Sequence, residues 1–439
     1  MRKLMIFFMI LALVLMGAGV VNASTSAQKQ TAIDNGLAYL AATQNADGSW
    51  TDVNSSSYDV ADTGAALLAF TEQYYKPLGW DGKNYSTVVT KATNYLMSQA
   101  SVLTFSAPNW WGYNGTGNSG QGLQWTNGGE ETYGSGIAIS GLCGLVSNPS
   151  GGTPLVNPST VISSSNAAVN GLTYAQVIQK SLDSWTWGQS PPSTGNRYGG
   201  WRYFTAQNDS DMSTTQWPIA DYLFAKPIPG VTIPGTAASG DKTSIGVNAF
   251  VTACQYPNAA YPSGYPAGSV DYQPGANLLS LTHIGGLLLA NALTGGGAGN
   301  VTTALAYLNA HWTDTPNNTW YGNEGNAYAM FAIYKGLESQ YGTTGAGPIT
   351  NLNPQTTAID PGATWNWWED YCQSLCTTQN ADGSWPGYGY WYGPLEAAWY
   401  VNILNATAIA PPAVPLPSSV LLLGSGLLGL AGWRRFKKS

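Results

Sequence analysis

The string Gln-Asn-Ala-Asp-Gly-Ser-Trp occurs twice in this chain of 439 residues, at positions 44–50 and 379–385. Chance repetition of seven residues at so wide a separation is negligible. Such a repeat is typical of chains built from one supersecondary unit used several times. The repeat therefore constrains the fold more than any other feature of the sequence, and the unit around each copy has to be identified first.

The residues around the first copy predict a pair of helices. Ile33, Leu37, Leu40 and Thr43 follow a helical spacing upstream, and the Asp-Gly pair inside the string is a strong helix breaker. Downstream, residues 63–75 are more uniformly apolar. A helix that is polar on one face lies at a surface, whereas one that is apolar all round is buried. We therefore predict an outer helix, a polar loop and an inner helix.

The same unit can be followed along the chain with less literal repetition. After the first pair, the predicted outer and inner helices are 86–100 with 132–146, 174–187 with 212–225, 244–254 with 276–293, 301–312 with 326–339, and 365–377 with 395–404. Six such hairpins can close into a ring, an (α/α)6 toroid over residues 24–410, in which each inner helix is buried by its neighbours. Two smaller helical bundles are the alternative, with 226–244 and 342–363 as linkers.

The spacing within the repeat resembles the Gln-Trp repeat of squalene–hopene cyclases and their relatives, including the β subunits of protein prenyltransferases. Its residues here are Gln44, Gly48 and Trp50 in the first copy and Gln379, Gly383 and Trp385 in the second. The segments 199–203 and 209–213 look like a degenerate third copy. The resemblance implies an α/α toroid in which the Gln caps helix-end backbone groups and the Trp covers the seam between hairpins.

The chemistry of these enzymes does not transfer. The cyclase motif Asp-x-Asp-Asp is replaced by Asp59-Val60-Ala61-Asp62, so alanine stands where the family places its proton donor. Asp59 and Asp62 can equally cap the inner helix that follows. Zinc in a prenyltransferase needs Asp, Cys and His; Asp370 and Cys372 lie on an outer helix, and His283 and His311 are the only histidines. We expect no metal and no other cofactor, and whether the chain is an enzyme stays open.

A site for a sugar or lipid ligand is the remaining prediction. Acid pairs among aromatic side chains are typical of glycoside chemistry and sugar binding. The loops that enter the inner helices would open at one mouth of the toroid. Their catalytic candidates are Asp59, Asp62, Glu130, Glu131 and Asp211, and their ligand-binding candidates are Trp111, Trp125, Trp201, Tyr203, Trp320 and Trp391. The alternative for all of these residues is a structural role, in which the carboxylates cap helices and the aromatic rings pack over the seams between hairpins.

Both ends of the chain predict processing. Residues 1–23 have the layout of a secretory signal peptide, with Arg2 and Lys3, an apolar run, and a small-x-small site that ends at Ala23. Residues 411–439 contain a proline-rich linker, about 15 apolar residues and a basic end, which is short for a membrane span. This tail resembles PEP-CTERM sorting signals, with Val414, Pro415, Leu416 and Pro417 as its motif. The resemblance implies transient anchoring by a short transmembrane helix, with signal peptidase and an exosortase-like enzyme as partners.

Charge and cysteine content limit the partners further. Removal of both ends takes away Arg2, Lys3, Arg434, Arg435, Lys437 and Lys438 but none of the 23 acidic residues, which leaves a net charge of −13. We therefore expect neither nucleic acid nor anionic lipid as a partner, because both require a cationic surface. The four cysteines reach an oxidising compartment; Cys143 with Cys254 is the less strained pairing, and buried free thiols are the favoured alternative.

Overall fold

The computed structural model describes residues 25–52, 58–125, 130–149, 151–205, 207–234, 242–256, 265–315, 321–388 and 392–406. The predicted signal peptide and sorting tail, including its transmembrane segment, lie outside these residues. Among the described residues, no helix is both long and apolar enough to cross a membrane. The prediction of a mainly helical chain is confirmed.

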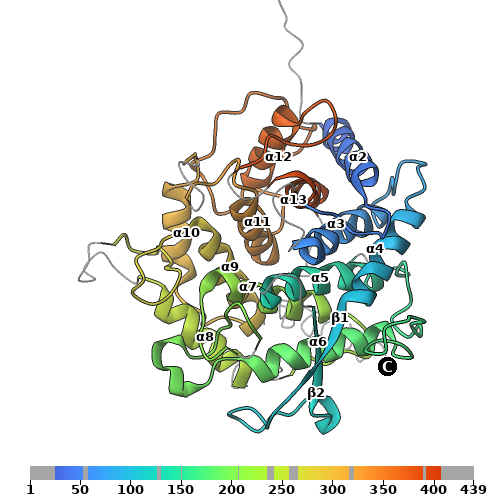
Figure 1. Cartoon of the computed structure of the whole chain (residues 1–439). Coiled ribbons are helices and arrows are strands. Elements are labelled where there is room, and N and C mark those ends of the chain that lie inside the picture. The colour runs from blue at the N-terminus through green and yellow to red at the C-terminus, as the bar shows by residue number, and fades with distance from the viewer. Residues whose placement is uncertain are drawn as a thin grey trace, which may run out of the picture.

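The described residues form twelve α-helices (Figure 1), and along the chain a half-buried helix alternates with a fully buried one. The half-buried, outer helices are α2 (Ser26–Thr43), α4 (Ser86–Gln99), α6 (Tyr174–Gly188), α8 (Lys242–Cys254), α10 (Val301–Ala310) and α12 (Trp367–Thr378). The buried, inner helices are α3 (Asp59–Tyr74), α5 (Glu131–Val146), α7 (Met212–Ala225), α9 (Leu281–Thr294), α11 (Ala327–Tyr341) and α13 (Gly393–Asn405). Two short 3-10 helices, η2 (Thr116–Asn118) and η3 (Pro192–Arg197), lie in loops.

The inner helices contact one another in a closed order. α3 packs on α5, α5 on α7, α7 on α9, α9 on α11, α11 on α13, and α13 packs back on α3. The outer helices surround this group, and α2 and α12 lie side by side although they are the first and the penultimate helices (Figure 1). The buried hydrophobic side chains form one continuous core. Helices are therefore present near all twelve of the predicted positions.

Two local features differ from the predictions. The inner helix expected to begin at residue 276 begins at Leu281, because Asn277 has a positive φ of 66° and Ser280 caps the helix through Thr282 N. A short antiparallel hairpin, β1 (Ala100–Thr104) with β2 (Gln121–Trp125), was not predicted. Strand β2 lies against α6, where the Ser184 hydroxyl donates to Leu123 O at 2.7 Å. Packing on α6 therefore stabilises five-residue strands that carry little sequence signal of their own.

The first copy of the repeated string joins two hairpins. Trp50 is fully buried and donates from Nε1 to Leu40 O at 2.7 Å, which ties the loop to the end of α2. Gln44 donates from Nε2 to Gly48 O at 3.1 Å and to Val88 O of α4 at 2.9 Å. A Cβ on Gly48 would lie 2.3 Å from Lys91 O, so only glycine allows α4 to approach this closely.

The second copy repeats this arrangement between the two ends of the chain. Gln379 donates to Gly383 O and, at 2.9 Å, to Ala32 O of α2. Trp385 donates from Nε1 to Leu375 O at 2.9 Å. The first and last hairpins are thereby joined by the same contacts that join the first and second.

Two further glutamines also join one outer helix to the next, and neither was predicted from the sequence. Gln189 follows α6 and donates to Gly199 O and to Thr243 O of α8 at 3.0 Å, while Trp201 donates to Trp185 O at 2.8 Å. Gln255 follows α8 and donates to Asn300 O at the start of α10. Insertions separate each of these glutamines from its glycine, so the short spacing that identified the other copies is lost. A glutamine directly after an outer helix was the available signal.

Candidate functional site

The loops divide the molecule into two opposite faces. The described residues within 44–58, 100–130, 189–211, 255–280, 311–326 and 379–392 lead from outer to inner helices, and we refer to them as the mouth face. The described residues within 75–85, 147–173, 226–241, 295–300 and 342–366 lead from inner to outer helices, and we refer to them as the terminal face. Neighbouring mouth loops contact one another, as in the hydrogen bond of 2.8 Å from Gln273 Nε2 to Ser210 O.

Asp59 and Asp62 lie in the first turn of α3, but neither caps it. The N-cap residue is Tyr58, and no side chain accepts a capping bond there, so the capping prediction is wrong for this helix. Asp62 is fully buried, and burial together with the nearby Asp52 carboxylate raises its pKa well above the usual range. Burial also raises the pKa of Asp59. Ala61 is buried beside them, so the residue at the donor position offers no acid.

Glu130 and Asp211 come together at the entrance to α5 and α7. Burial raises the pKa of Glu130, and the Asp211 carboxylate raises it further. Asp211 is the N-cap of α7 and accepts from Thr214 N at 2.8 Å and from Ser213 Oγ at 2.6 Å. Its other oxygen accepts from Tyr272 OH at 3.1 Å. Burial also raises the pKa of Glu131, the first residue of α5, but no neighbouring carboxylate contributes to that shift. The predicted acids therefore interact in two pairs, Glu130 with Asp211 and Asp62 with Asp59.

Two of the predicted aromatic platforms are packing residues instead. Trp125 and Trp201 are 0% exposed, so neither ring has a face open to a ligand. Trp125 donates from Nε1 to Leu96 O at 2.7 Å, which repeats the role of Trp50 at another seam. Tyr203 is half-buried and its hydroxyl lies 2.6 Å from that of Tyr272, in the network of Asp211. Trp320 and Trp391 lie outside the described residues.

Trp111 belongs to a partly exposed aromatic cluster on the mouth face. Its ring centroid lies 6.4 Å from that of Trp110 and 5.1 Å from that of Tyr113, and Trp110 packs edge-on against Tyr198 at 5.4 Å. Asp183 of α6 holds the loop, since it accepts from Tyr113 OH at 2.6 Å and from Thr116 N at 3.0 Å. We call Trp110, Trp111, Tyr113 and Tyr198 the platform. Four half-buried rings are thus held in one place by a buried carboxylate.

Aromatic side chains fill the space between the inner helices. Trp217 of α7 stacks on Tyr328, Phe331 and Trp399 at centroid distances of 6.1 Å, and all four residues are buried. Tyr328 donates to Ser213 O at 2.6 Å, which links this stack to the Asp211 network. The residues between α7, α11 and α13 therefore pack against each other rather than around an apolar ligand.

A buried charge cluster near the other end of the inner helices was not predicted. Lys335 of α11 lies 3.2 Å from Glu72 of α3 and 3.6 Å from Glu338, and all three side chains are buried. Burial raises the pKa of Glu338 to about 7. On the mouth side, burial raises the pKa of Glu396 to about 8. Lone acidic residues in apolar helices carry no periodic signal, which is why these groups escaped the sequence analysis.

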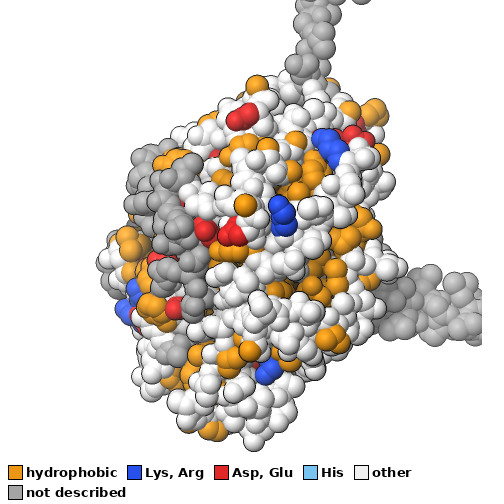
Figure 2. Space-filling model, turned by 45° about the vertical axis from the view of Figure 1, so that its right-hand side comes forward, with side chains coloured by type: hydrophobic (Ala, Val, Ile, Leu, Met, Phe, Trp, Pro, Cys, Tyr) orange, Lys and Arg blue, Asp and Glu red, His pale blue; other side chains and the backbone are white. Residues whose placement is uncertain are grey.

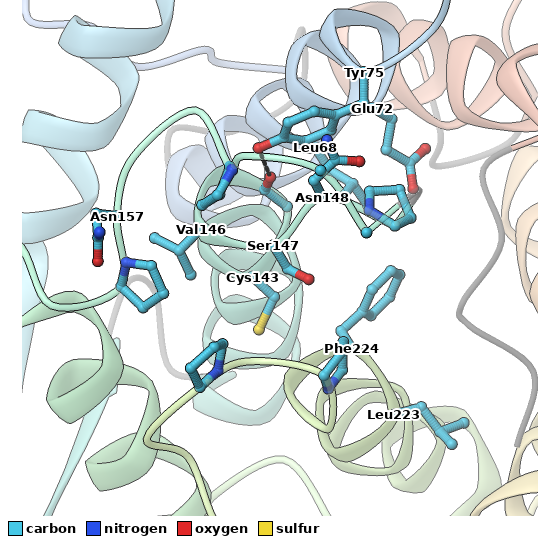
Figure 3. A pocket seen from close by; sticks show the side chains of 18 of the residues that line it. Leu68, Glu72, Tyr75, Cys143, Val146, Ser147, Asn148, Asn157, Leu223 and Phe224 are labelled. Atoms are coloured by element: carbon cyan, nitrogen blue, oxygen red, sulfur yellow. Dashed lines mark hydrogen bonds between the residues drawn. The ribbon is translucent and has the colours of Figure 1, made fainter. Parts of the chain in front are cut away.

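Two cavities open on the terminal face. One of about 720 Å³ is lined by the ends of α3, α5 and α7, with Leu68, Glu72, Cys143 and Phe224 around it (Figure 3). Another of about 570 Å³ is lined by Ser26, Lys76 and Asn405. Neither contains any of the predicted site residues. The visible surface in Figure 2 carries few, scattered charged side chains among polar and apolar ones.

The cysteines and histidines have structural surroundings. All four cysteines are free thiols, and Cys143, Cys254 and Cys372 are buried, so the favoured expectation of buried free thiols is confirmed for these three and Cys143 is not paired with Cys254. His283 is a core residue whose Nδ1 lies 3.2 Å from Val270 O, and burial lowers its pKa to about 4. His311 pairs with Asp314 at 2.8 Å. Asp370 accepts from Trp312 Nε1. The described residues contain no group of three His, Cys, Asp or Glu placed to hold a metal.

Comparison with known families is informative for the tail alone. Residues 413–435 match the PEP-CTERM protein-sorting motif. This motif marks an exported protein that is held transiently at the membrane by its C-terminal segment and processed by an exosortase. The predicted motif residues Val414, Pro415, Leu416 and Pro417 lie within the match. No curated protein matches the chain closely enough to indicate its family.

Proposed function

We propose that the exported domain is an (α/α)6 toroid of the terpenoid cyclase and prenyltransferase superfamily with a binding or structural role at the cell surface. The closed order of contacts among the inner helices supports this architecture. So does the common position of Gln44, Gln189, Gln255 and Gln379, each of which follows an outer helix and bonds to the next one.

A role in binding is favoured over cyclisation of a polyene. Protonation of an isolated alkene needs a positioned acid in a dry cavity that admits the substrate. Position 61 is alanine, and Trp217, Tyr328, Phe331 and Trp399 occupy the space between the inner helices. The domain therefore lacks both the positioned acid and the open, dry cavity on which cyclisation of a polyene depends.

The ligand that the mouth face suits best is a carbohydrate, and the platform carries this proposal. Aromatic rings that are partly exposed and rigidly held offer flat apolar faces to sugar rings at little entropic cost. Polar, mostly uncharged side chains surround them, since Asn, Ser, Thr and Gly dominate residues 105–120. Exopolysaccharide of the cell surface is the ligand that this location provides.

The test is retardation of the purified domain, residues 24–410, in native gels that contain a soluble neutral polysaccharide or exopolysaccharide from the host. We expect the parent domain to be retarded and Trp111→Ala to lose most of the retardation. Tyr341→Ala, which removes an exposed ring on the terminal face, is the matched control and should behave as the parent. Equal retardation of parent and Trp111→Ala would exclude the platform as the binding site.

A glycan hydrolase is the second candidate, and Glu130 with Asp211 favours it. Glycosidases use two carboxyl groups, one kept protonated by its surroundings, and both pKa values here are raised by burial. Release of reducing sugar from the same polysaccharides should then be abolished in Asp211→Asn. Asp211 also caps α7, so Glu130→Gln, which removes no cap, decides between a catalytic and a structural cause.

A further inference from the structure

The two ends of the described domain lie on the same face. Ser26 donates from its backbone N to Asp360 Oδ2 at 2.8 Å, and Lys76 Nζ donates to Ala406 O at 3.2 Å. Ser26 and Asn405 line the same cavity. An even number of helices that alternate in direction returns the chain to the face on which it began. The terminal face therefore carries both the start and the end of the domain.

A short segment joins the C-terminal end of the domain to the apolar run of the tail. That run begins at Val420, 14 residues after Ala406. A fully extended chain spans about 3.5 Å per residue, so this connection reaches roughly 49 Å. A compact domain of this length has a radius of gyration of roughly 21 Å, so a chain that leaves the terminal face cannot pass around the domain and bring the mouth face to the bilayer.

The charges of the two faces favour the same orientation as the tether does. The described loops of the terminal face and the first turns of the outer helices carry Lys29, Lys76, Lys83, Lys226 and Lys242 against Asp81, Asp360, Glu369 and Asp370, so their charges nearly balance. The mouth loops and the first turns of the inner helices are acidic, with only Arg197 and Arg202 among Asp47, Asp52, Asp59, Asp62, Glu130, Glu131, Asp209, Asp211, Asp271, Asp314, Glu324, Asp382 and Glu396. An anionic bilayer attracts lysines near its surface and repels carboxylates within a Debye length.

We propose that the terminal face is the membrane-facing surface of the anchored protein, and that its partner is an anionic bilayer. The expectation that the acidic domain avoids anionic lipid then holds for the mouth face and not for the terminal face. The mouth face then points away from the cell, where it presents the platform to the surrounding matrix. This orientation rests on the proposed export and surface role, and it adds which side of the domain meets the lipid. Tethering and charge act independently, and both give the same orientation.

Two matched labelling positions test the orientation. Ala346 and Ala381 are both exposed alanines in loops, the first on the terminal face and the second on the mouth face. The full chain, with its tail uncleaved, is reconstituted in vesicles of phosphatidylcholine and phosphatidylglycerol as Ala346→Cys or Ala381→Cys. Cys376→Ser serves as background because the other three cysteines are buried. A fluorophore on each cysteine is quenched by lipids that carry a spin label on the headgroup.

We expect quenching at position 346 to be several-fold stronger than at position 381. Equal quenching, or stronger quenching at 381, would overturn the orientation while leaving the surface role intact. Flotation of the vesicles separates the orientation from the surface role. A full chain that does not float with the vesicles has no anchoring tail, and both proposals then fail. When the quenching measurement is repeated at high salt on protein that carries Lys226→Glu and Lys242→Glu, the difference between positions 346 and 381 should become smaller. These conditions remove the contribution of charge to the orientation and leave that of the tether.

Discussion

At the scale of single residues, the buried tryptophans of the repeat are the main determinants of stability. Trp50 is fully buried against the end of α2, and its indole N–H is satisfied by Leu40 O. Removal of a buried Trp typically costs about 3–5 kcal/mol. That is a large fraction of the stability of an ordinary domain.

Trp50→Ala should therefore lower the free energy of unfolding by about 3–5 kcal/mol, measured by urea denaturation with circular dichroism. Trp50→Phe should recover part of this loss, because it restores most of the packing but not the bond to Leu40. Trp111→Ala, which removes a half-buried ring, should cost clearly less. A Trp50→Ala protein as stable as the parent would show that the repeat does not hold the hairpins together.

Glu396 gives a prediction about pH. Its pKa is about 8 in the folded protein against an ordinary value of 4.5, so the folded state binds more protons than the unfolded state between these values. Stability then falls as pH rises from about 4.5 to about 8, by at most ~1.4 kcal/mol per pH unit from this group. Glu396→Gln should flatten this fall in urea titrations, and Asp81→Asn, an exposed control, should not. Identical slopes for parent and Glu396→Gln would contradict the raised pKa.

At the scale of elements, a buried ion pair joins the first helix to the penultimate helix. Lys29 Nζ of α2 lies 2.6 Å from Glu369 of α12 and 4.2 Å above the ring of Trp368. Both charged side chains are buried. Removal of one partner from a buried pair leaves an uncompensated charge, whereas replacement of both by apolar residues is often tolerated.

Lys29→Met should therefore destabilise the protein by about 3–5 kcal/mol, and Lys29→Met with Glu369→Leu should recover most of that loss. His311→Ala, which breaks an exposed pair with Asp314, should cost less than about 1 kcal/mol. Free energies of unfolding for the single and double variants form the complete cycle. Additive losses would show that Lys29 and Glu369 do not interact energetically.

At the scale of the whole molecule, the position of the two chain ends predicts tolerance of circular permutation. Ser26 and Asn405 border one cavity, so a Gly-Ser linker of roughly ten residues can join the ends without strain. New ends between Gly151 and Gly152 fall in an exposed loop. This permutant should keep the parent far-UV spectrum and melt within a few degrees of it. A permutant opened between Ala65 and Ala66, inside buried α3, should fail to fold; equal behaviour of the two would contradict the closed packing.

The sequence by itself determined the helices and their order. Helical periodicity and breakers are local properties, so outer and inner helices were predicted with small errors in their bounds, and the repeated string showed that they form one kind of unit. The tail could also be recognised, because its apolar run, prolines and basic end are contiguous in sequence. The acids Glu130 and Asp211 were named as candidates but could not be paired.

The tertiary structure decided what each side chain does. Trp125 and Trp201, which were predicted to bind a ligand, are buried and pack against the protein instead. Trp217 and its aromatic neighbours fill the space between the inner helices. Lys335 lies beside Glu338 and beside Glu72, which is 263 positions away in the sequence. The fold also places Ser26 and Asn405 beside one cavity. Exposure, pairing and pKa depend on which helices pack together, and that is a property of contacts between residues far apart in the chain, which a local pattern does not encode.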